Sequence, residues 1–390
     1  RGVYDWSQLD KVVNDVKAAG GRMVLTDDTT PAWAVAPERV AGVPWVKNAT
    51  AYPPDDFNDL RAYLRGIFKR YGDASGVLAA VEVWNEPNTK DRWKGTDAQM
   101  VEMAGVFREI ARETAHPPLI FGIQVSAGLH GAYIRRLGEA GILGQVDGIS
   151  GHWYEEMMAY DEATPISNLP RKVKEFKAIV PEGKPIPIWN SESGINVVPR
   201  EEGKLVSQEE LNRRAEQTPG FDPAEPWIVN KKWRRVSERR AAASYIGGTL
   251  LLMSLGVEKT FAYTSYGVVM DGAPSLCWVA YAVLGEQLGR VNYRKIAPVS
   301  ATLEPSDAGE NRAVALRLGD GDKPGLIVAW SYKLDPVGRS KHWQPWQPAL
   351  PVRVAVKARR VEISDLYGRA GSEAKVSNGF VTVPAGEEPV

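Results

Sequence analysis

Several residue types that build common active sites are scarce in this chain of 390 residues. The single cysteine, Cys277, excludes an internal disulfide and a zinc site made of thiolates, and it leaves the redox compartment open. The four histidines form no His-Glu-x-x-His motif, and there is no Gly-x-Ser-x-Gly elbow or glycine-rich phosphate loop. We therefore set aside metal-assisted hydrolysis, serine hydrolysis and nucleotide chemistry.

The chain also lacks an excess of either charge. Lys plus Arg and Asp plus Glu both number 48, so the formal net charge is zero. No overall field would draw the protein to a nucleic acid or an anionic membrane surface, and we expect neither as a partner. No stretch approaches 18 consecutive apolar residues; the longest interrupted run, Tyr245 to Val257, predicts a buried helix.

Apolar and aromatic residues are plentiful enough for a large core. Apolar residues make up 44% of the chain, and 13 Trp and 14 Tyr stand against 8 Phe. Most of these rings are expected in the core, but the flat apolar face of Trp also suits stacking on a sugar ring.

Short apolar runs alternate with helical patterns through the first three quarters of the chain, which favours parallel βαβ units. The first helix is expected to start with Ser7 as its N-cap, and Thr96-Asp97-Ala98-Gln99 forms a capping box before another. The predicted strands lie at 22–25, 77–83, 119–125, 146–150, 187–189 and 259–263, and the helices at 7–19, 55–71, 100–114, 132–140, 171–179, 238–255 and 275–288.

Six such strands indicate a (β/α)8 TIM barrel that is two strands short. The deficit lies before residue 1, so we expect the first two barrel strands to be missing from this chain. The segment 197–235 is charged and too long for an ordinary βα loop, which predicts either a binding loop or a solvated excursion.

From about residue 292 the pattern changes to alternating strands, such as Val352, Val354 and Val356 between polar neighbours. Further strands are predicted at 312–318, 325–331, 361–364 and 380–383. We therefore expect two domains: a catalytic barrel over residues 1–291 and an antiparallel β-sandwich over residues 292–390.

Two glutamates follow predicted barrel strands. Glu86 stands in Trp84-Asn85-Glu86-Pro87-Asn88, and Glu192 in Trp189-Asn190-Ser191-Glu192, three strands further along. The carboxyl ends of barrel strands are where active sites of this fold lie. Two carboxylates at one barrel mouth are the equipment of a glycosidase, although either residue alone could equally cap a helix or pair with an arginine.

These two motifs, with Trp93 after the first, resemble the strand 4 and strand 7 signatures of clan A retaining glycoside hydrolases. The chain is most similar to glycoside hydrolase family 39, the family of β-xylosidases and related enzymes, although that family more often has Thr before and Phe after the second glutamate. The resemblance implies that Glu86 is the general acid and base, that Glu192 is the nucleophile and that Asn85 holds the sugar 2-hydroxyl.

Other residues after strand ends complete the expected site. An acid that stays protonated needs an apolar or negative setting, so Glu86 is expected there, with donors such as His152 and Tyr154 around Glu192. His152 could equally be a core residue. Glu82 is expected inside the barrel as a structural residue. Four aromatic rings after strand ends are expected to stack on the bound sugar: Trp33, Trp93, Tyr263 and Tyr266. Trp343 and Trp346, further along the chain, could reach the cleft or pack in the core.

The resulting hypothesis is an exo-acting retaining β-glycosidase, β-xylosidase-like, whose partner is an oligosaccharide or polysaccharide substrate. Its two carboxyl groups are expected about 5 to 5.5 Å apart. The reaction needs no metal or organic cofactor. Two alternatives stay open: an endo-acting enzyme on a polysaccharide, and a carbohydrate-binding protein that no longer turns over.

Overall fold

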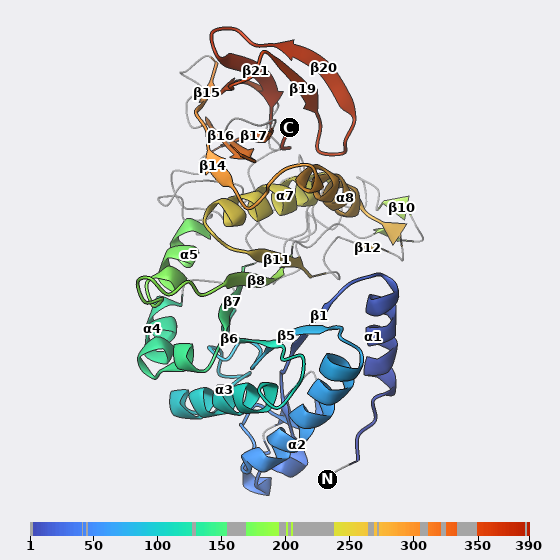
Figure 1. Cartoon of the computed structure of the whole chain (residues 1–390), viewed down its shortest axis with the longest axis vertical. Coiled ribbons are helices and arrows are strands. Elements are labelled where there is room, and N and C mark those ends of the chain that lie inside the picture. The colour runs from blue at the N-terminus through green and yellow to red at the C-terminus, as the bar shows by residue number, and fades with distance from the viewer. Residues whose placement is uncertain are drawn as a thin grey trace, which may run out of the picture. The chain divides into compact units, whose positions relative to one another are not determined.

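The computed structural model describes residues 3–40, 42–43, 46–126, 130–153, 169–194, 200–201, 204–205, 238–263, 269–270, 273–304, 311–320, 325–333, 349–386 and 388–390 (Figure 1). The chain divides into two compact units. The first comprises Arg1–His152 and Lys174–Ser191, and the second comprises Trp153–Val173 and Glu192–Val390.

A six-stranded sheet has the order β1-β5-β6-β7-β8-β11. Strands β1 to β7 in this order pair in parallel. The amides of Ile149 and Trp153 donate to the carbonyls of Pro187 and Glu192, so β8 also runs parallel to β7. The strands are β1 (Met23–Thr26), β5 (Leu78–Glu82), β6 (Leu119–Val125), β7 (Gly148–His152), β8 (Ile188–Ser193) and β11 (Lys259–Ala262). All six predicted strands are confirmed, in chain order.

The helices between these strands are also confirmed, and local capping explains several of their ends. Asp56 accepts the Asn58 amide at the start of α2, Thr96 and Gln99 form the predicted capping box of α3, and Ser275 caps α8. The helices are α1 (Ser7–Ala18), α2 (Phe57–Ile67) with the π-helical segment η3 (Phe68–Ala74), α3 (Asp97–Ala111), α4 (Gly131–Glu139) with the 3₁₀ turn η4 (Ile142–Gly144), α5 (Leu169–Lys177), α7 (Glu238–Ser254) and α8 (Leu276–Gly289).

The predicted cap of α1 was wrong. Ser7 is the first helical residue, and its amide donates to the Asp5 carboxylate over 3.0 Å. An aspartate two residues earlier satisfies a free amide at this helix end as a serine hydroxyl would.

Short elements fill stretches that the sequence pattern left as loops. All but one of their strands have two residues, which is too short to show a side-chain periodicity. Between β1 and α2 lie the sheet β2-β4-β3 and two 3₁₀ turns. These elements are β2 (Thr30–Pro31), η1 (Ala32–Ala34), η2 (Pro37–Arg39), β3 (Gly42–Val43) and β4 (Val46–Thr50), and two hairpins are β9 (Arg200–Glu201) with β10 (Lys204–Leu205) and β12 (Val269–Met270) with β13 (Ala273–Pro274).

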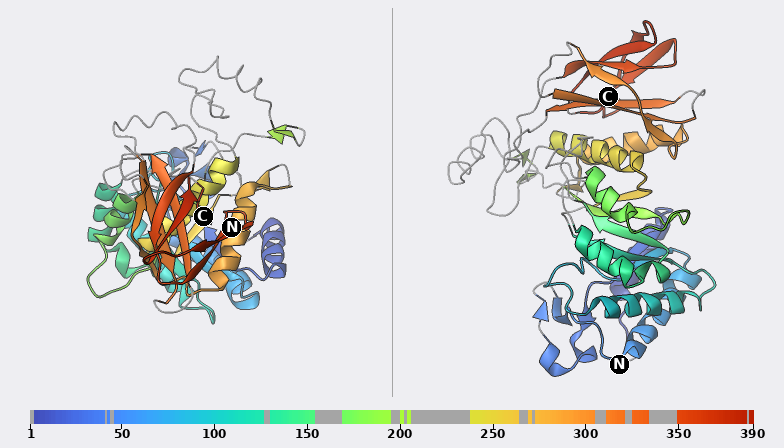
Figure 2. Two further views of the ribbon diagram at one scale, coloured as in Figure 1. Left: turned by 90° about the horizontal axis from the view of Figure 1, so that it is seen from above. Right: turned by 90° about the vertical axis from the view of Figure 1, so that its left-hand side faces the viewer.

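The C-terminal strands form antiparallel sheets, as predicted (Figure 2). One has the order β14-β16-β17, another β15-β18-β21, and β19 pairs with β20. Their bounds are β14 (Ile296–Pro298), β15 (Ala301–Leu303), β16 (Asn311–Leu318), β17 (Leu326–Lys333), β18 (Leu350–Ala355), β19 (Arg360–Ser364), β20 (Ala370–Lys375) and β21 (Phe380–Ala385).

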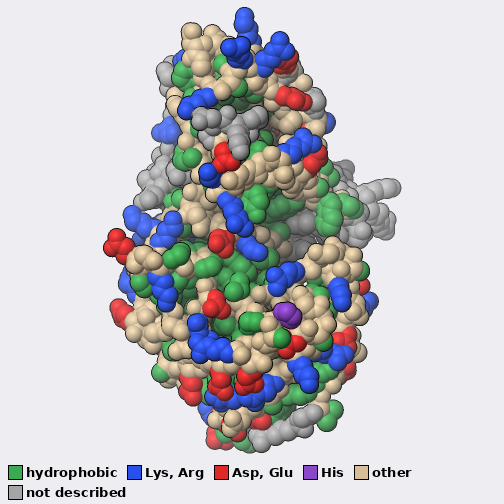
Figure 3. All heavy atoms as spheres, in the orientation of Figure 1, with side chains coloured by type: hydrophobic (Ala, Val, Ile, Leu, Met, Phe, Trp, Pro, Cys, Tyr) green, Lys and Arg blue, Asp and Glu red, His purple; other side chains and the backbone are tan. Residues whose placement is uncertain are grey.

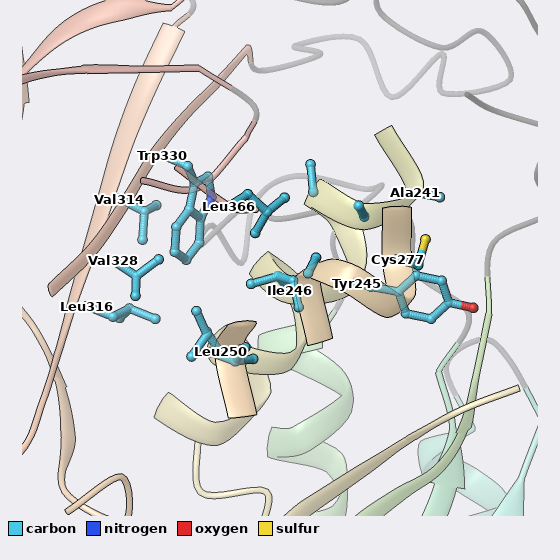
Figure 4. Packing of buried hydrophobic residues seen from close by; sticks show 14 of the residues in the cluster. Ala241, Tyr245, Ile246, Leu250, Cys277, Val314, Leu316, Val328, Trp330 and Leu366 are labelled. Carbon is cyan, nitrogen blue, oxygen red and sulfur yellow. The ribbon is translucent and has the colours of Figure 1, made fainter. Parts of the chain in front are cut away.

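Strand alternation gives β16 and β17 two different buried faces. Small residues, Ala315 and Ala329, pack on the apolar face of β18 and β21. Large residues on the opposite face, including Val314 and Trp330, pack against α7 and α8. Figure 4 shows the Trp330 ring and Val314 facing Ile246 and Leu250 of α7. This core continues across residue 292, and the domain boundary there stays a prediction.

Helix α7 ends at Ser254 and so contains residues 245–254 of the apolar run predicted as a buried helix; within it Ile246, Leu250 and Leu251 are buried. Among the residues that the structure describes, no helix has the length and apolar character to cross a membrane.

Charged side chains of both signs intermingle on the surface in Figure 3. In the first unit, Arg61 and Arg65 of α2 pair with Glu109 and with Glu113, linking α2 to the end of α3.

Candidate active site

Glu86 stands in a tight turn directly after β5. Its backbone is left-handed, with φ of +46°, a conformation that a residue with a side chain adopts at a cost. The Trp84 amide donates to Gln124 Oε1 over 3.2 Å, and the Thr89 amide donates to the Glu86 carbonyl over 3.1 Å. The surrounding hydrogen bonds therefore hold the strained turn.

Strand β6 supports this turn through an irregularity. Ile123 and Gln124 both have positive φ, +80° and +33°, where the register with β7 shifts. The Gln124 side chain at this bulge is fully buried. Its Oε1 accepts from the Trp84 amide after β5, and its Nε2 donates to the Phe121 carbonyl of β6. Bulges of this kind re-aim side chains beside functional sites.

The carboxylate of Glu86 has a nitrogen partner on each oxygen. His152 Nδ1, at the end of β7, lies 3.2 Å from Oε1, and Arg92 Nε lies 2.9 Å from Oε2. The Glu86 side chain is 17% exposed and that of His152 only 2%. A small open face of the carboxylate is left for another molecule.

The charge state of Glu86 differs from the sequence expectation. Burial raises the pKa of this carboxyl, but the His152 hydrogen bond and the charges of His152, Arg92 and His130 outweigh it, so the pKa lies below its ordinary value. The sequence expected an apolar or negative setting here and placed His152 among the donors to Glu192. In the structure His152 Nδ1 contacts the Glu86 carboxylate.

Glu82 lies inside the barrel, as expected. Its carboxylate, 2% exposed, accepts from Thr26 Oγ1 of β1 over 2.6 Å and from Ser150 Oγ of β7 over 2.7 Å. It therefore joins three strands and is fully engaged in structural bonds.

Glu192, like Glu86, lies at the carboxyl end of a barrel strand, here β8. It is half-buried, and its carbonyl accepts the Trp153 amide over 3.0 Å. Ser193 Oγ then donates to the Phe261 carbonyl, and its own carbonyl accepts the Tyr263 amide, so β11 fixes this strand end. Glu86 belongs to the first unit and Glu192 to the second. The expected spacing of their carboxyl groups stays a prediction.

The remaining expected site residues fall into three groups. Asn85 Oδ1 is buried and has no hydrogen-bond partner within the described ranges, which suits a residue awaiting a ligand hydroxyl. Trp33 and Tyr263 are 55% and 44% exposed, so their faces are accessible. Trp93 is 7% exposed, edge-on to Trp84 and against Gly95, which favours packing over an open sugar platform. Tyr154, Tyr266, Trp343, Trp346 and most of the 197–235 segment lie outside the described residues.

Three charged residues near Glu86 were missed by the sequence analysis: Arg92, Asp28 and His130. Arg92 stands beside Trp93, in the loop that the motif had already marked, and an arginine six residues after a predicted acid was a usable signal. Asp28 follows β1 and lies 3.3 Å from Arg92 Nη1. Only the fold brings it near Glu86, so no local pattern could indicate it.

No group of three or more His, Cys, Asp or Glu side chains suited to a metal ion occurs among the described residues.

Comparisons with known proteins find likenesses of structure but not of sequence. No known family model matches the sequence, and no curated protein matches it. A xylanase of glycoside hydrolase family 30, subfamily 8, from Clostridium acetobutylicum aligns with a TM-score of 0.56 and 14% identity, over 98% of this chain and 82% of its own. A glucosidase from Croceicoccus marinus gives 0.53 and 12%, over 99% and 81%. A family 51 arabinofuranosidase from Xanthomonas axonopodis pv. citri gives 0.53 and 13%, over 97% and 77%.

These likenesses establish the fold. The parallel sheet is that of a TIM barrel, with antiparallel sheets added at the C-terminal end of the chain. None of the three structures is described as a member of family 39.

Proposed function

We propose that this protein is a retaining glycoside hydrolase in which Glu86 is the general acid and base and Glu192 is the nucleophile. The observation that carries the proposal is the setting of Glu86: its backbone is strained, the Gln124 bulge supports the nearby residue Trp84, and Arg92 and the buried His152 both contact its carboxylate. Strain of this kind is concentrated at functional sites.

In the first step, the Glu192 carboxylate attacks the anomeric carbon while the bond from that carbon to the leaving oxygen breaks. The Glu86 carboxyl gives its proton to the leaving oxygen, and a glycosyl ester forms on Glu192. In the second step, ionised Glu86 takes a proton from water, the water oxygen attacks the anomeric carbon and the ester bond breaks. Two inversions leave the configuration retained.

The contacts around Glu86 suit the state between these steps. Arg92 and His152 stabilise the carboxylate that exists once the proton has left. Intact substrate, bound before the first step, would displace water from the carboxyl and favour the protonated form that this step needs. Asn85 Oδ1 is available to accept a sugar hydroxyl.

We further propose a β-linked, xylose-type substrate cleaved from a chain end. The motif resemblance to β-xylosidases supports the sugar, and the fold likeness to a family 30 xylanase is consistent with it. The exposed Trp33 favours a second candidate, endo action, because an open ring after β1 offers a stacking surface for a further sugar unit.

The experiment is a set of initial rates on chromogenic β-xylosides, β-glucosides, β-galactosides and α-L-arabinosides, and on xylan, for the parent and for Glu192→Gln. We expect one aryl glycoside to be cleaved and the variant to lose at least about 10³-fold in kcat/KM. Glu139→Gln, an exposed glutamate on α4, is the matched control and should keep the parent rate.

Cleavage of xylan with no aryl glycoside turned over would support endo action. Binding of sugars without any turnover would contradict the proposed enzyme and identify a carbohydrate-binding protein.

A further inference from the structure

Arg92 is fixed in the loop between β5 and α3 by backbone contacts that do not involve its charge. Its amide donates to the Thr89 carbonyl over 3.1 Å, and its carbonyl accepts Trp84 Nε1 over 2.7 Å. Thr89 in turn donates through its amide and its Oγ1 to the Glu86 carbonyl. The loop therefore folds back on the strained residue that begins it.

The guanidinium of Arg92 lies between two carboxylates from different strand ends. Nε is 2.9 Å from Glu86 Oε2, and Nη1 is 3.3 Å from Asp28 Oδ1. Each of the three side chains is less than a third exposed. Because a guanidinium presents several donors in one rigid plane, a carboxylate at each side fixes its orientation.

Taking Glu86 as the general acid and base, we propose that Arg92 and Asp28 are positioning residues of the proposed glycosidase: Arg92 fixes the Glu86 carboxylate and favours its ionised form, and Asp28 orients Arg92 and partly offsets its charge. This inference rests on the proposed function and assigns a role to two residues outside the glutamate pair.

The consequence is a specific pH dependence. A general acid must carry its proton, so activity falls as the pH rises through the pKa of Glu86. The described charged groups that act on this carboxyl are His152 at the end of β7, Arg92 in its own loop and His130 before α4. Arg92 is the one guanidinium in this set, and a guanidinium keeps its charge over the whole working pH range.

The test is the pH profile of kcat/KM for the parent, Arg92→Gln and Arg92→Lys. Loss of the cation should raise the pKa of Glu86 and move the alkaline limb of Arg92→Gln upward by about 1 to 3 pH units. Arg92→Lys keeps a charge and should leave that limb closer to the parent. Arg65→Gln removes an arginine paired with Glu113 on the helical surface and should leave the profile unchanged.

Asp28→Asn provides a change of opposite sign, because it removes the negative charge that offsets Arg92. Its alkaline limb should move to lower pH. This variant and Arg92→Lys keep the test informative where Arg92→Gln fails to fold, as judged by circular dichroism.

A second readout does not depend on turnover. The carboxyl carbon of Glu86, labelled with ¹³C and assigned by its loss in Glu86→Gln, can be titrated by NMR. Its midpoint should move upward in Arg92→Gln. Equal rate losses at every pH with an unmoved midpoint would overturn the positioning role. Full activity of Glu86→Gln would instead contradict the proposed function, and the NMR shift would still decide the effect of Arg92.

Discussion

Asp27 at the end of β1 allows the clearest test of the electrostatics at this barrel mouth. Burial, together with the neighbouring charge of Asp28, raises the pKa of this carboxyl from 3.8 to about 7, against a hydrogen bond with the Asp28 backbone that lowers it. The aspartate is therefore a carboxyl group that holds its proton across the acid range, in a half-buried position.

The pH dependence of the free energy of unfolding follows from the protonation of Asp27 in the folded and the unfolded chain. Below about pH 4 the carboxyl is protonated in both the folded and the unfolded chain, and it contributes no pH dependence. As the pH rises from about 4 to about 7, the unfolded chain releases the proton while the folded chain keeps it, so stability is lost over this window. A change from 3.8 to about 7 corresponds to about 4 kcal/mol at most, and partial exposure reduces it to about 2 kcal/mol.

Asp27→Asn removes this titration and keeps the shape of the side chain. We expect the variant to exceed the parent in free energy of unfolding by about 2 kcal/mol more at pH 8 than at pH 4. Urea unfolding at a series of pH values, with the slope checked for constancy, measures the difference. Asp15→Asn, on the exposed side of α1, is the control. A difference between Asp27→Asn and the parent that is constant with pH, or that grows toward acid, would refute the argument.

Two further predictions concern packing inside the first unit. Glu82→Ala should lower the free energy of unfolding by about 3 kcal/mol, since it leaves the hydroxyls of Thr26 and Ser150 without their buried acceptor, whereas Glu82→Gln should cost about 1 kcal/mol; equal costs in urea unfolding would contradict this. Gly148→Ala should lower the free energy of unfolding by about 1 to 3 kcal/mol, because a Cβ there would lie 2.2 Å from the Phe121 ring, which stacks on Trp189. Thermal unfolding measures the loss. The control is Gly144→Ala, whose Cβ would meet no atom within 4 Å and which should unfold close to the parent.

Periodicity predicted the long elements of the fold because each buries one face. The six barrel strands and the helices between them have apolar positions that only one arrangement buries, and the alternation in β16 and β18 indicated antiparallel strands. The short sheet β2-β4-β3 could not be predicted, since β2 and β3 have only two residues each and leave no side-chain pattern.

The sequence also predicted part of the candidate site. Glu86 and Glu192 follow strand ends, so local sequence already indicates where they point. The partners of Glu86 were harder to foresee. His152 contacts it from the end of β7, whereas Asp28 after β1 and Gln124 of β6 contact its neighbours Arg92 and Trp84. The bulge at Ile123 depends on the register of β6 with β7. The sign of the pKa change at Glu86 depends on these contacts, which is why the sequence alone suggested the opposite.

The central claim is that Glu86 and Glu192 divide the two roles of a double displacement. The most direct measurement is the product that Glu86→Ala and Glu192→Ala each form from an activated aryl glycoside in the presence of azide, with the anomeric configuration read by NMR. In Glu86→Ala, azide should replace water in the second step and give a glycosyl azide of retained configuration. In Glu192→Ala, azide should occupy the place of the nucleophile and give the inverted configuration. The same configuration from both variants, or azide products from neither while both keep the parent rate, would contradict the assignment.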